Sequence, residues 1–488
     1  MLYLTLLLAI PLFGAATLFF VPYQYRHLIR PLAVAFASVT LALAVGLLAL
    51  YDTGASGLQL VESFHWNPRL GTYYALGLDG FSLPMVLLTA LLCLIAILAS
   101  GGIRNRIKAY YMLMLVLETA ILGVFMAQDW ALFYLFWEMT LIPLFFLIDR
   151  WGGSGRHGAA MNFVLYTLGG SVFILISLLT LFDASPDGSF QMASIAAGAM
   201  ALSEQQQLLV FLGLLIGFGV KMPIFPIHGW LPLAHVEAPA PVSILLSGIL
   251  LKMGAYGLIR AAEMLPGVVV TLQPWLMALA FVSLIHGGLL AWWQRDLKRM
   301  IAYSSVSHMG VVLLGIAACN VAGLMGAVMQ MIAHGLVAGL LFLLIGLLYE
   351  RTRTRDIDDY SSLVRVMPRF AFFAVLAFVA AIGLPGTAGF IAELHTLIGG
   401  FERWGWGVVP LTFGVLISAT YAIRTIGRLF TGPLRPAMQN IEDLKSHEFI
   451  AAGALAVSII FIGLFPAPVL NLISASVNQF GTLFADRF

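Results

Sequence analysis

The sequence predicts an all-helical, polytopic membrane protein, and three observations lead to this fold class. The 488-residue chain is 61% hydrophobic and 10% charged, whereas soluble domains are about 45–50% apolar and about 25% charged. Apolar runs recur along the whole chain, each near the length of ~20 residues that crosses a bilayer as a helix. The longest polar connections, about 51–80, 183–206 and 350–369, are too short for a soluble domain.

The apolar runs predict about fourteen helices. The first run, 2–21, lacks a charged leading segment and a clear cleavage site, so we expect a retained span and not a signal peptide. The seventh and twelfth helices are interrupted, the eleventh is overlong, and the tail after Asn471 is amphipathic enough to lie on the membrane surface. The expected cores are 3–21, 31–50, 81–100, 109–127, 130–149, 159–182, 207–226, 240–262, 271–292, 299–318, 321–349, 370–396, 407–430 and 448–470.

The charges orient these helices across the membrane. Most of the 25 basic residues fall in the odd-numbered loops, so the positive-inside rule places those loops in the cytoplasm and both termini on the opposite side. The net charge of +2 is spread over loops and gives no indication of nucleic-acid binding. Cys93 and Cys319 lie in apolar runs, which favours packing over a disulfide or a metal site.

Two helices are broken at corresponding places. Pro223 and Pro226 interrupt the seventh, and the glycine-rich stretch 383–389 interrupts the twelfth. The breaks lie five helices apart, so their helices run in opposite senses, as in the inverted repeats of transporters. Two independent kinks are the alternative. We therefore expect N-terminal helices in 1–108, a first repeat of helices 4–8 in 109–262, an inverted second repeat of helices 9–13 in 263–430, and the last helix and tail in 431–488.

Ionisable residues stand inside the predicted helices. A bare charge at the bilayer centre costs about 2.5–3.5 kcal/mol even on a lenient insertion scale, so these residues must face the bundle interior, pair with one another or contact water. His228 and His286 are less certain in depth than the others. The candidates are Glu118, Glu138, Lys252, His308 and His334 within helices, and Lys221, His228 and Glu393 near the breaks.

This collection of residue types suits proton transfer. A buried carboxylate and a buried lysine each favour the neutral form unless an opposite charge is near, so a Glu–Lys pair that separates acts as a switch. Glu138 and Lys221 are the expected pair, and His308 and His334 could pass protons through water. Glu118 has a structural reading as a satisfied carboxylate. His286 and His395 are equally explained by packing. His228, His235 and Glu237 cluster without the spacing of a zinc site.

Five stretches carry a resemblance to a known family. The chain resembles the antiporter-like subunit M, or chain 4, of respiratory complex I, the proton-pumping NADH:quinone oxidoreductase. The wording HVEAPAPVSILL is closer to the versions of cyanobacteria and chloroplasts, which belong to photosynthetic complexes, and this leaves the electron donor and quinone open. The matching stretches are LFYLFWEMTLIPLFFLI, KMPIFPIHGWLPLAHVEAPAPVSILLSGILLKMGAYGLIR, KRMIAYSSVSHMGVVLLG, MQMIAHGLVAGLLFLLIG and GLPGTAGFIAE.

The resemblance implies a fold of fourteen helices with an inverted five-helix repeat, and it implies roles for the candidate residues. Glu138 and Lys221 become the ion pair of the pump, and Lys252 the central connection. His308 and His334 become relay residues, and Glu393 the terminal proton site, where sister subunits typically have lysine.

The resemblance also implies a setting for the chain. Quinone, flavin and iron–sulfur clusters are expected only in other subunits, with no cofactor in this chain. The implied partners are membrane-arm and peripheral-arm subunits, neighbouring antiporter-like subunits and lipids, without nucleic acid. The location is a bacterial inner membrane, or a thylakoid membrane in a photosynthetic relative. The alternatives are a subunit of a multisubunit Na⁺/H⁺ antiporter or of a hydrogenase- or CO2-hydration-linked relative.

Overall fold

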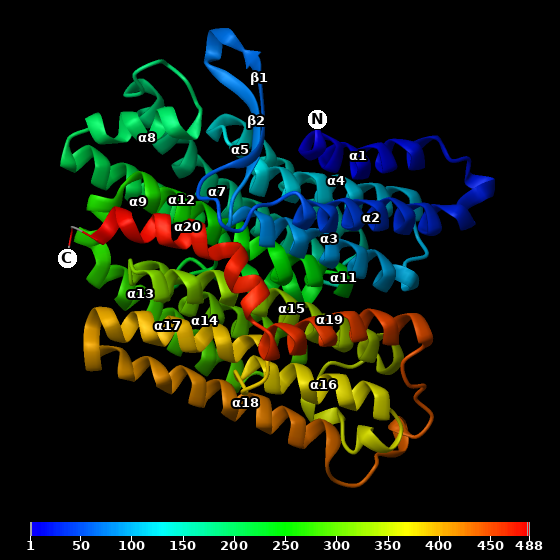
Figure 1. The fold of residues 1–488 in the computed structure, drawn as a ribbon. Coiled ribbons are helices and arrows are strands. Elements are labelled where there is room, and N and C mark those ends of the chain that lie inside the picture. Colours follow the sequence, from blue (N-terminus) through cyan, green and yellow to red (C-terminus); the bar gives the residue numbers. More distant parts are fainter. Residues whose placement is uncertain (1, 486, 488) are drawn as a thin grey trace.

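The computed structural model describes residues 2–485 and 487 as a bundle of long helices that lie side by side, with one β-hairpin projecting from it (Figure 1). Twelve helical segments of the described chain are long and apolar enough to cross a membrane. Two of the fourteen expected spans do not meet that standard. The seventh, helix α9 (Glu204–Lys221), has 18 residues but begins with a glutamate and three glutamines, which lower its mean hydropathy. The first part of the twelfth, α16 (Pro368–Ala381), has only 14 residues because of the break, and its second part forms one segment with the thirteenth.

The N-terminal part contributes three long helices and the hairpin. These are α1 (Tyr3–Phe20), α2 (Ile29–Gly46) and α3 (Ser82–Ala99), with the antiparallel strands β1 (Gln59–Asn67) and β2 (Thr72–Leu78) between α2 and α3. We expected a polar connection over 51–80. The strands alternate in burial only weakly, and they pair with each other and not with a larger sheet, so their sequence carries little strand signal.

The first half of the central bundle is interrupted in several places. The second-half helices then follow in the same layer (Figure 1), and α20 turns back beside α12 and α3. The first half contains α4 (Ile107–Met126), α5 (Trp130–Met139), α6 (Leu141–Trp151), α7 (Arg156–Asp183), α8 (Met192–Ala201), α9, α10 (Trp230–Glu237), α11 (Ala240–Leu245), a π-helical turn (Leu246–Leu250) and α12 (Leu251–Met264). The remainder contains α13 (Pro266–Trp293), α14 (Leu297–Ala317), α15 (Val321–Thr352), α16, α17 (Ala388–Trp404), α18 (Thr412–Phe430), α19 (Ser446–Leu464) and α20 (Ala467–Ala485).

The C-terminal tail is longer than expected. Instead of starting after Asn471, the last helix α20 begins at Ala467, directly after α19. The side chains of Ile473, Val477 and Phe480 on its inner face are buried. Gly80 donates its backbone N–H to Ser476 Oγ at 2.9 Å, which attaches α20 to the start of α3. The tail is therefore packed on the bundle along one face.

The loops rich in basic residues gather at one end of the bundle. Arg355 donates to the carbonyl of Val236 at 2.5 Å, and the backbone N–H of Gly153 donates to the carbonyl of Glu237 at 2.9 Å. Ile357 donates likewise to the carbonyl of Arg295. Four of the odd-numbered loops therefore lie together, as their common sidedness predicts. We call this the basic end of the molecule.

The centre of the bundle is formed by three helical segments: 240–264, α14 and α15. The apolar windows of 240–264 and α15 are 100% buried, whereas that of α2 is only 28% buried. Helices such as α2 therefore have room to face lipid, while ionisable residues on the central helices are shielded from it by protein. This placement puts Lys252, His308 and His334 in the middle of the molecule.

Candidate proton-translocation site

The first break holds Lys221 in an aromatic and hydroxyl environment. Lys221 is the last residue of α9 and is 2% exposed. Its Nζ donates to Thr140 Oγ1 at 2.8 Å and lies 4.3 Å from the ring centre of Trp137. Thr140 is the residue between α5 and α6, so one helix break meets another at this ammonium group. A cation over an indole face is stabilised by the ring quadrupole, which lets the charge remain buried.

Glu138 and Lys221, expected as a pair that can separate, lie without direct contact in this structure. Among the described residues, no ion pair within 4.0 Å joins them, although the charge of Glu138 acts on Lys221 at longer range. The Lys221 ammonium donates its hydrogen bond to Thr140 instead. Oε1 of Glu138 is buried without a hydrogen-bond partner. The two side chains are therefore near neighbours in a separated arrangement.

Glu118 lies elsewhere on α4 and has no polar contact. Its side chain is fully buried, and neither carboxylate oxygen has a hydrogen-bond partner. The alternative, that Glu118 is a structural carboxylate with its hydrogen bonds satisfied, is not supported, because the structure shows no hydrogen-bond partner for either oxygen. Glu118 is not brought into contact with the two lysines by any hydrogen bond of the described chain.

Lys252 is hydrogen-bonded directly to His334. Its Nζ lies 2.7 Å from His334 Nδ1 and donates to the carbonyl of Ser247 at 2.6 Å. Ser247 belongs to the π-helical turn before α12, where the wider backbone leaves its carbonyl accessible. Lys252 is fully buried. The structure thus joins α12 to α15 through an ammonium–imidazole hydrogen bond.

The second histidine extends this line towards the second break. The rings of His308 and His334 lie 5.4 Å apart between centroids, and His308 Nδ1 is 3.1 Å from Gln330 Nε2. His308 and Glu393 line one small cavity of about 20 Å³. A site of about 10–15 Å³ is enough for one water molecule. The cavity that His308 and Glu393 share is therefore large enough for one water molecule.

The second break makes room for Glu393. Gly383 has φ +79°, and a Cβ there would sit 3.1 Å from Cδ of Glu393. Only glycine adopts this backbone conformation without strain and also leaves space for the carboxylate. The break between α16 and α17 therefore places Glu393 over bare backbone.

The other histidines fall into two groups. His228, in the break after α9, and His286, on α13, have ring centroids 5.3 Å apart, and His228 Nδ1 is buried without a partner. His395 Nδ1 lies 2.8 Å from the carbonyl of Ile391 in its own helix. His228 and His286 thus form a pair beside the first break, and His395 has a local bond that accounts for it.

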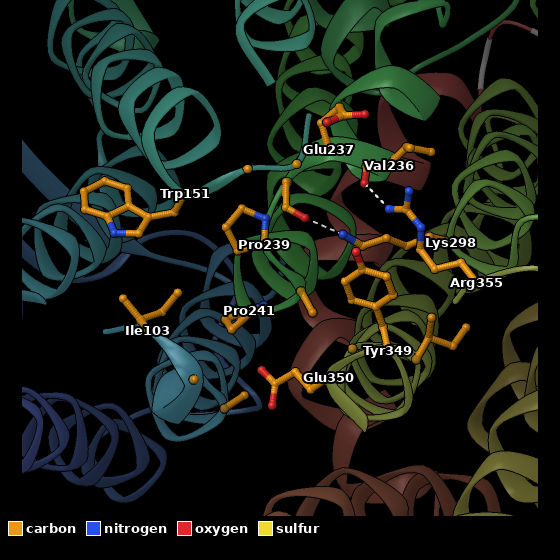
Figure 2. Close-up of a pocket in the computed structure, with 18 of the residues that line it drawn as sticks. Ile103, Trp151, Val236, Glu237, Pro239, Pro241, Lys298, Tyr349, Glu350 and Arg355 are labelled. Atoms are coloured by element: carbon orange, nitrogen blue, oxygen red, sulfur yellow. Dashed lines mark hydrogen bonds between the residues drawn. The ribbon is translucent and has the colours of Figure 1, made fainter. Parts of the chain in front are cut away.

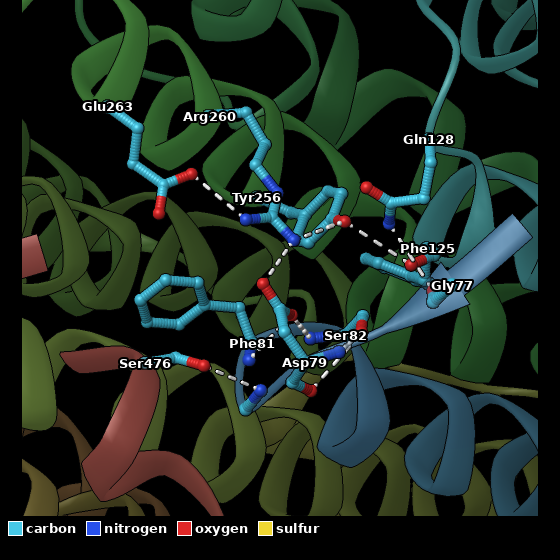
Figure 3. Close-up of polar contacts among 11 residues, drawn as sticks. Gly77, Asp79, Phe81, Ser82, Phe125, Gln128, Tyr256, Arg260, Glu263 and Ser476 are labelled. Atoms are coloured by element: carbon cyan, nitrogen blue, oxygen red, sulfur yellow. Dashed lines mark hydrogen bonds and ion pairs between the residues drawn. The ribbon is translucent and has the colours of Figure 1, made fainter. Parts of the chain in front are cut away.

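Sequence reasoning missed an ion cluster at the end opposite the basic loops. Arg260 donates to Asp79 at 2.6 Å, to Glu263 at 2.9 Å and to Tyr256 Oη at 3.0 Å (Figure 3). Arg260 is 9% exposed, and the cluster borders a cavity of about 320 Å³. A signal existed: Lys252, Tyr256 and Arg260 recur every four residues and share one face of α12. Asp79, 181 residues away, could not be assigned as their partner from spacing.

The family model described as "NADH:quinone oxidoreductase/Mrp antiporter, TM" matches residues 127–418, more than half of the chain. The chain belongs to this family. Among its relatives, "NAD(P)H-quinone oxidoreductase chain 4 1" of Picosynechococcus sp. is 41% identical over 95% of this chain and 89% of that protein. "NAD(P)H-quinone oxidoreductase chain 4-1" of Synechocystis sp. is 37% identical over 98% and 93%. The resemblance drawn from the five stretches is confirmed.

Solved structures agree with the fold. A chain of respiratory complex I from Thermus thermophilus with bound NADH superposes with a TM-score of 0.91, at 31% identity over 98% of this chain and 99% of that one. A chain of the Mrp complex from Dietzia sp. superposes with a TM-score of 0.87 at 21% identity over 98% and 97%, a likeness of fold alone. This chain is therefore an integral membrane protein with the antiporter-like fold of complex I.

Within the part of the chain that the structure describes, no group of three or more histidine, cysteine, aspartate or glutamate residues has the geometry to hold a metal ion. The buried polar groups instead form pairs and short lines: Lys221 with Thr140, Lys252 with His334, and His308 beside Glu393. Each group can bind or release a proton, or hydrogen-bond to one that does. The arrangement is chemically suited to moving protons.

Proposed function

We propose that the chain is a proton-translocating membrane-arm subunit of a complex I-type NAD(P)H or ferredoxin:quinone oxidoreductase. The observation that carries the proposal is the buried line Lys252–His334–His308–Glu393, which crosses the centre of the bundle to the second break. Ammonium and imidazole groups bind and release protons, which suits the line to proton transfer. Sequence identity favours the oxidoreductase over a Na⁺/H⁺ antiporter subunit, because the relatives named above with 37–41% identity are NAD(P)H-quinone oxidoreductase chains, whereas the Mrp chain agrees in fold at 21% identity.

The proposed mechanism begins at the first break. Glu138 approaches Lys221 and stabilises its ammonium, and withdrawal of Glu138 leaves the charge supported only by Thr140 and Trp137. Loss of that stabilisation favours transfer of the proton towards Lys252. The observed separation of the two side chains corresponds to the withdrawn arrangement. His228, beside the first break, contributes a further titratable group to this half.

The second half then completes the transfer. Lys252 passes a proton to His334 across their 2.7 Å hydrogen bond, and His308 hands it on to Glu393 through one water. Glu393 releases it at the second break. In this proposal, residues 109–262 and 263–430 act as inverted repeats, each with one broken helix. Glu118 is a further buried carboxylate, on α4, that can bind and release a proton.

The setting of the subunit is also part of the proposal. Electron transfer takes place on flavin, iron–sulfur clusters and quinone held by other subunits, and this chain responds to it mechanically and electrostatically. Its neighbours are other membrane-arm subunits, including antiporter-like ones, and lipids that cover helices such as α2. The membrane is the bacterial inner membrane, or the thylakoid membrane where the complex is photosynthetic.

Replacing Lys252 by Met tests the proposal, because methionine keeps an unbranched apolar chain and removes the proton site. We expect the purified complex in liposomes to reduce quinone with its native donor while its initial rate of proton pumping falls by at least about tenfold. The matched control is Lys445→Met, which changes an exposed lysine whose ion pair with Glu442 spans 3.9 Å. Pumping at the unmodified rate by the Lys252→Met complex would overturn the proposal.

A further inference from the structure

We propose that His235 is the proton-uptake residue of this subunit, taking protons from a water-filled cavity at the basic end and passing them to Lys252 along buried serine hydroxyls. The inference rests on the proposed function and adds to it the place where protons enter the chain. His235 is on α10, outside the line from Lys252 to Glu393. Three observations carry the inference: a cavity, an unpartnered histidine and a serine ladder.

The cavity lies among the basic-end loops and has a volume of about 330 Å³ (Figure 2). One water molecule occupies about 30 Å³ in the liquid, so the cavity holds several. Charged side chains reach it from different elements: Glu237 from α10, Lys298 from α14, and Glu350 from α15. Lys298 donates its Nζ to the carbonyl of Ala238, which orients the ammonium at the cavity wall. Such a lining keeps water in place and conducts protons.

His235 lies directly behind this wall. The three residues that follow it, Val236, Glu237 and Ala238, all line the cavity, while the His235 ring is fully buried. Neither ring nitrogen has a hydrogen-bond partner. The ring stacks on Phe342 with centroids 4.5 Å apart and planes 9° from parallel. Stacking on Phe342 accounts for a flat ring at this position but not for a histidine, because a buried N–H donor normally has a hydrogen-bond partner.

An interval separates His235 from the centre of the bundle, and α15 gives its length, because His235 stacks on Phe342 while Lys252 bonds to His334 of the same helix. Phe342 and His334 are eight residues apart on α15, which corresponds to about 12 Å along the helix. A proton from His235 must therefore pass through intermediate groups to reach Lys252.

Serines from two helices fill that interval. Ser243 Oγ donates to the carbonyl of His235 at 3.4 Å, and Ser247, one turn further, lies with its Oγ 2.8 Å from Ser305 Oγ. The carbonyl of Ser247 accepts from Lys252 Nζ at 2.6 Å. All three serines are fully buried. Hydroxyl groups both donate and accept. In the proposed path, water bridges the His235 ring to Ser243, Ser243 to Ser247, and the serines to Lys252 Nζ.

The transfer at His235 is balanced in protons. A proton from solvent, relayed through water in the cavity, binds one ring nitrogen, and the other nitrogen releases its proton towards Ser243 and Ser247, so no water is left as hydroxide. The ring ends neutral with its proton on the opposite nitrogen, and rotation or tautomer exchange resets it. Deprotonated Lys252 is the acceptor at the far end, which makes uptake conditional on its having discharged to His334.

The test replaces His235 by Phe in the whole complex, purified and reconstituted in liposomes with quinone and its native reduced donor. Phenylalanine keeps a flat ring on Phe342 and removes both nitrogens. We expect quinone reduction to continue and the initial pumping rate to fall by at least about tenfold. The matched control is His395→Phe, which changes a histidine bonded to its own helix and should pump normally.

A second variant covers the case in which His235→Phe does not assemble. Ser243→Ala removes one hydroxyl from a fully buried position and should slow pumping severalfold with quinone reduction retained. Normal pumping by either variant, while Lys252→Met abolishes it, would overturn the uptake role and leave the proposed function standing. Normal pumping by Lys252→Met would instead remove the proposed function itself.

Discussion

The two buried lysines hold their charges with different neutral partners. Lys221 contacts a hydroxyl and an indole face, whereas Lys252 contacts a carbonyl and an imidazole. Neither is within 4.0 Å of a carboxylate among the described residues. A buried charge without a close counter-charge is weakly held. Small movements of Glu138 or His334 therefore have large effects on where the proton resides.

Glu393 provides a prediction at this scale. Glu393→Gln keeps the size of the side chain over Gly383 but cannot release a proton, so pumping should fall by at least about tenfold while quinone reduction persists. Glu393→Asp retains a titratable group and should be milder than Gln. Proton pumping in liposomes measures both.

The same helix supplies the control for these variants. Glu402→Gln changes an exposed carboxylate near the other end of α17 and should pump normally. Normal pumping by Glu393→Gln would argue against a titratable role for Glu393, because glutamine keeps the size of the side chain and cannot release a proton.

Sequence reasoning identified the titratable groups, because a charge inside an apolar run is costly and therefore conspicuous. It could not identify their neutral partners. Thr140, Gln330 and Ser247 are polar residues of ordinary kind, and only the fold brings Thr140 to Lys221 across 81 residues. It paired Glu138 with Lys221 as a switch, and the structure adds Thr140 as the hydrogen-bond acceptor of the ammonium. Which of two neighbouring side chains touches an ammonium depends on local rotation of α5 against α9, and spacing does not determine that rotation.

At the scale of elements, the breaks were predictable and the additional turns were not. Prolines follow closely after α9 and glycines after α16, so the interruptions near Lys221 and Glu393 can be predicted from the sequence. The π-helical turn at Leu246–Leu250 contains one glycine, Gly248, but an isolated glycine is tolerated in an ordinary helix and does not indicate a π-turn. The hairpin of β1 and β2 was also missed, since an isolated pair of strands lacks a clear buried face.

The second break leads to a prediction about stability. Gly383→Ala places a Cβ against Glu393 on a backbone of φ +79°, so the assembled complex should be destabilised by roughly 1–3 kcal/mol. Thermal denaturation of the complex in detergent measures the change. Gly427→Ala, within α18 and with nothing within 4 Å of the new methyl group, should leave the midpoint unchanged or slightly higher. A neutral Gly383→Ala would show that the break relaxes at no cost.

At the scale of the whole molecule, the two ends are held together by different means. The basic end is assembled from loops joined by hydrogen bonds to backbone carbonyls around a cavity of about 330 Å³. The opposite end is held together by Arg260, which joins α12 to Asp79 at the start of α3, while Ser476 of α20 accepts a hydrogen bond from the adjacent Gly80. The Arg260 cluster borders a second cavity, of about 320 Å³.

The Arg260 cluster gives the prediction for this scale. Arg260→Gln leaves Asp79 and Glu263 as buried carboxylates without their cation, which should cost about 3–5 kcal/mol and reduce the amount of assembled complex. Asp79→Asn combined with Arg260→Gln should restore part of it, because the more buried charge is then gone. The yield of intact complex on a native gel measures both. Equal yields for the single variant and the unmodified chain would show that water replaces the ion pair.

The π-helical turn beside Lys252 has a consequence for movement. Such a turn contains one residue more than the surrounding helix needs, and each residue of an α-helix advances the helix by about 100° of rotation. If the surplus residue shifts past Lys252, that side chain swings off His334 while both ends of the helix stay where they are. Rotation of this one helical segment would then interrupt the line from Lys252 to Glu393, while the helices around it stay in place.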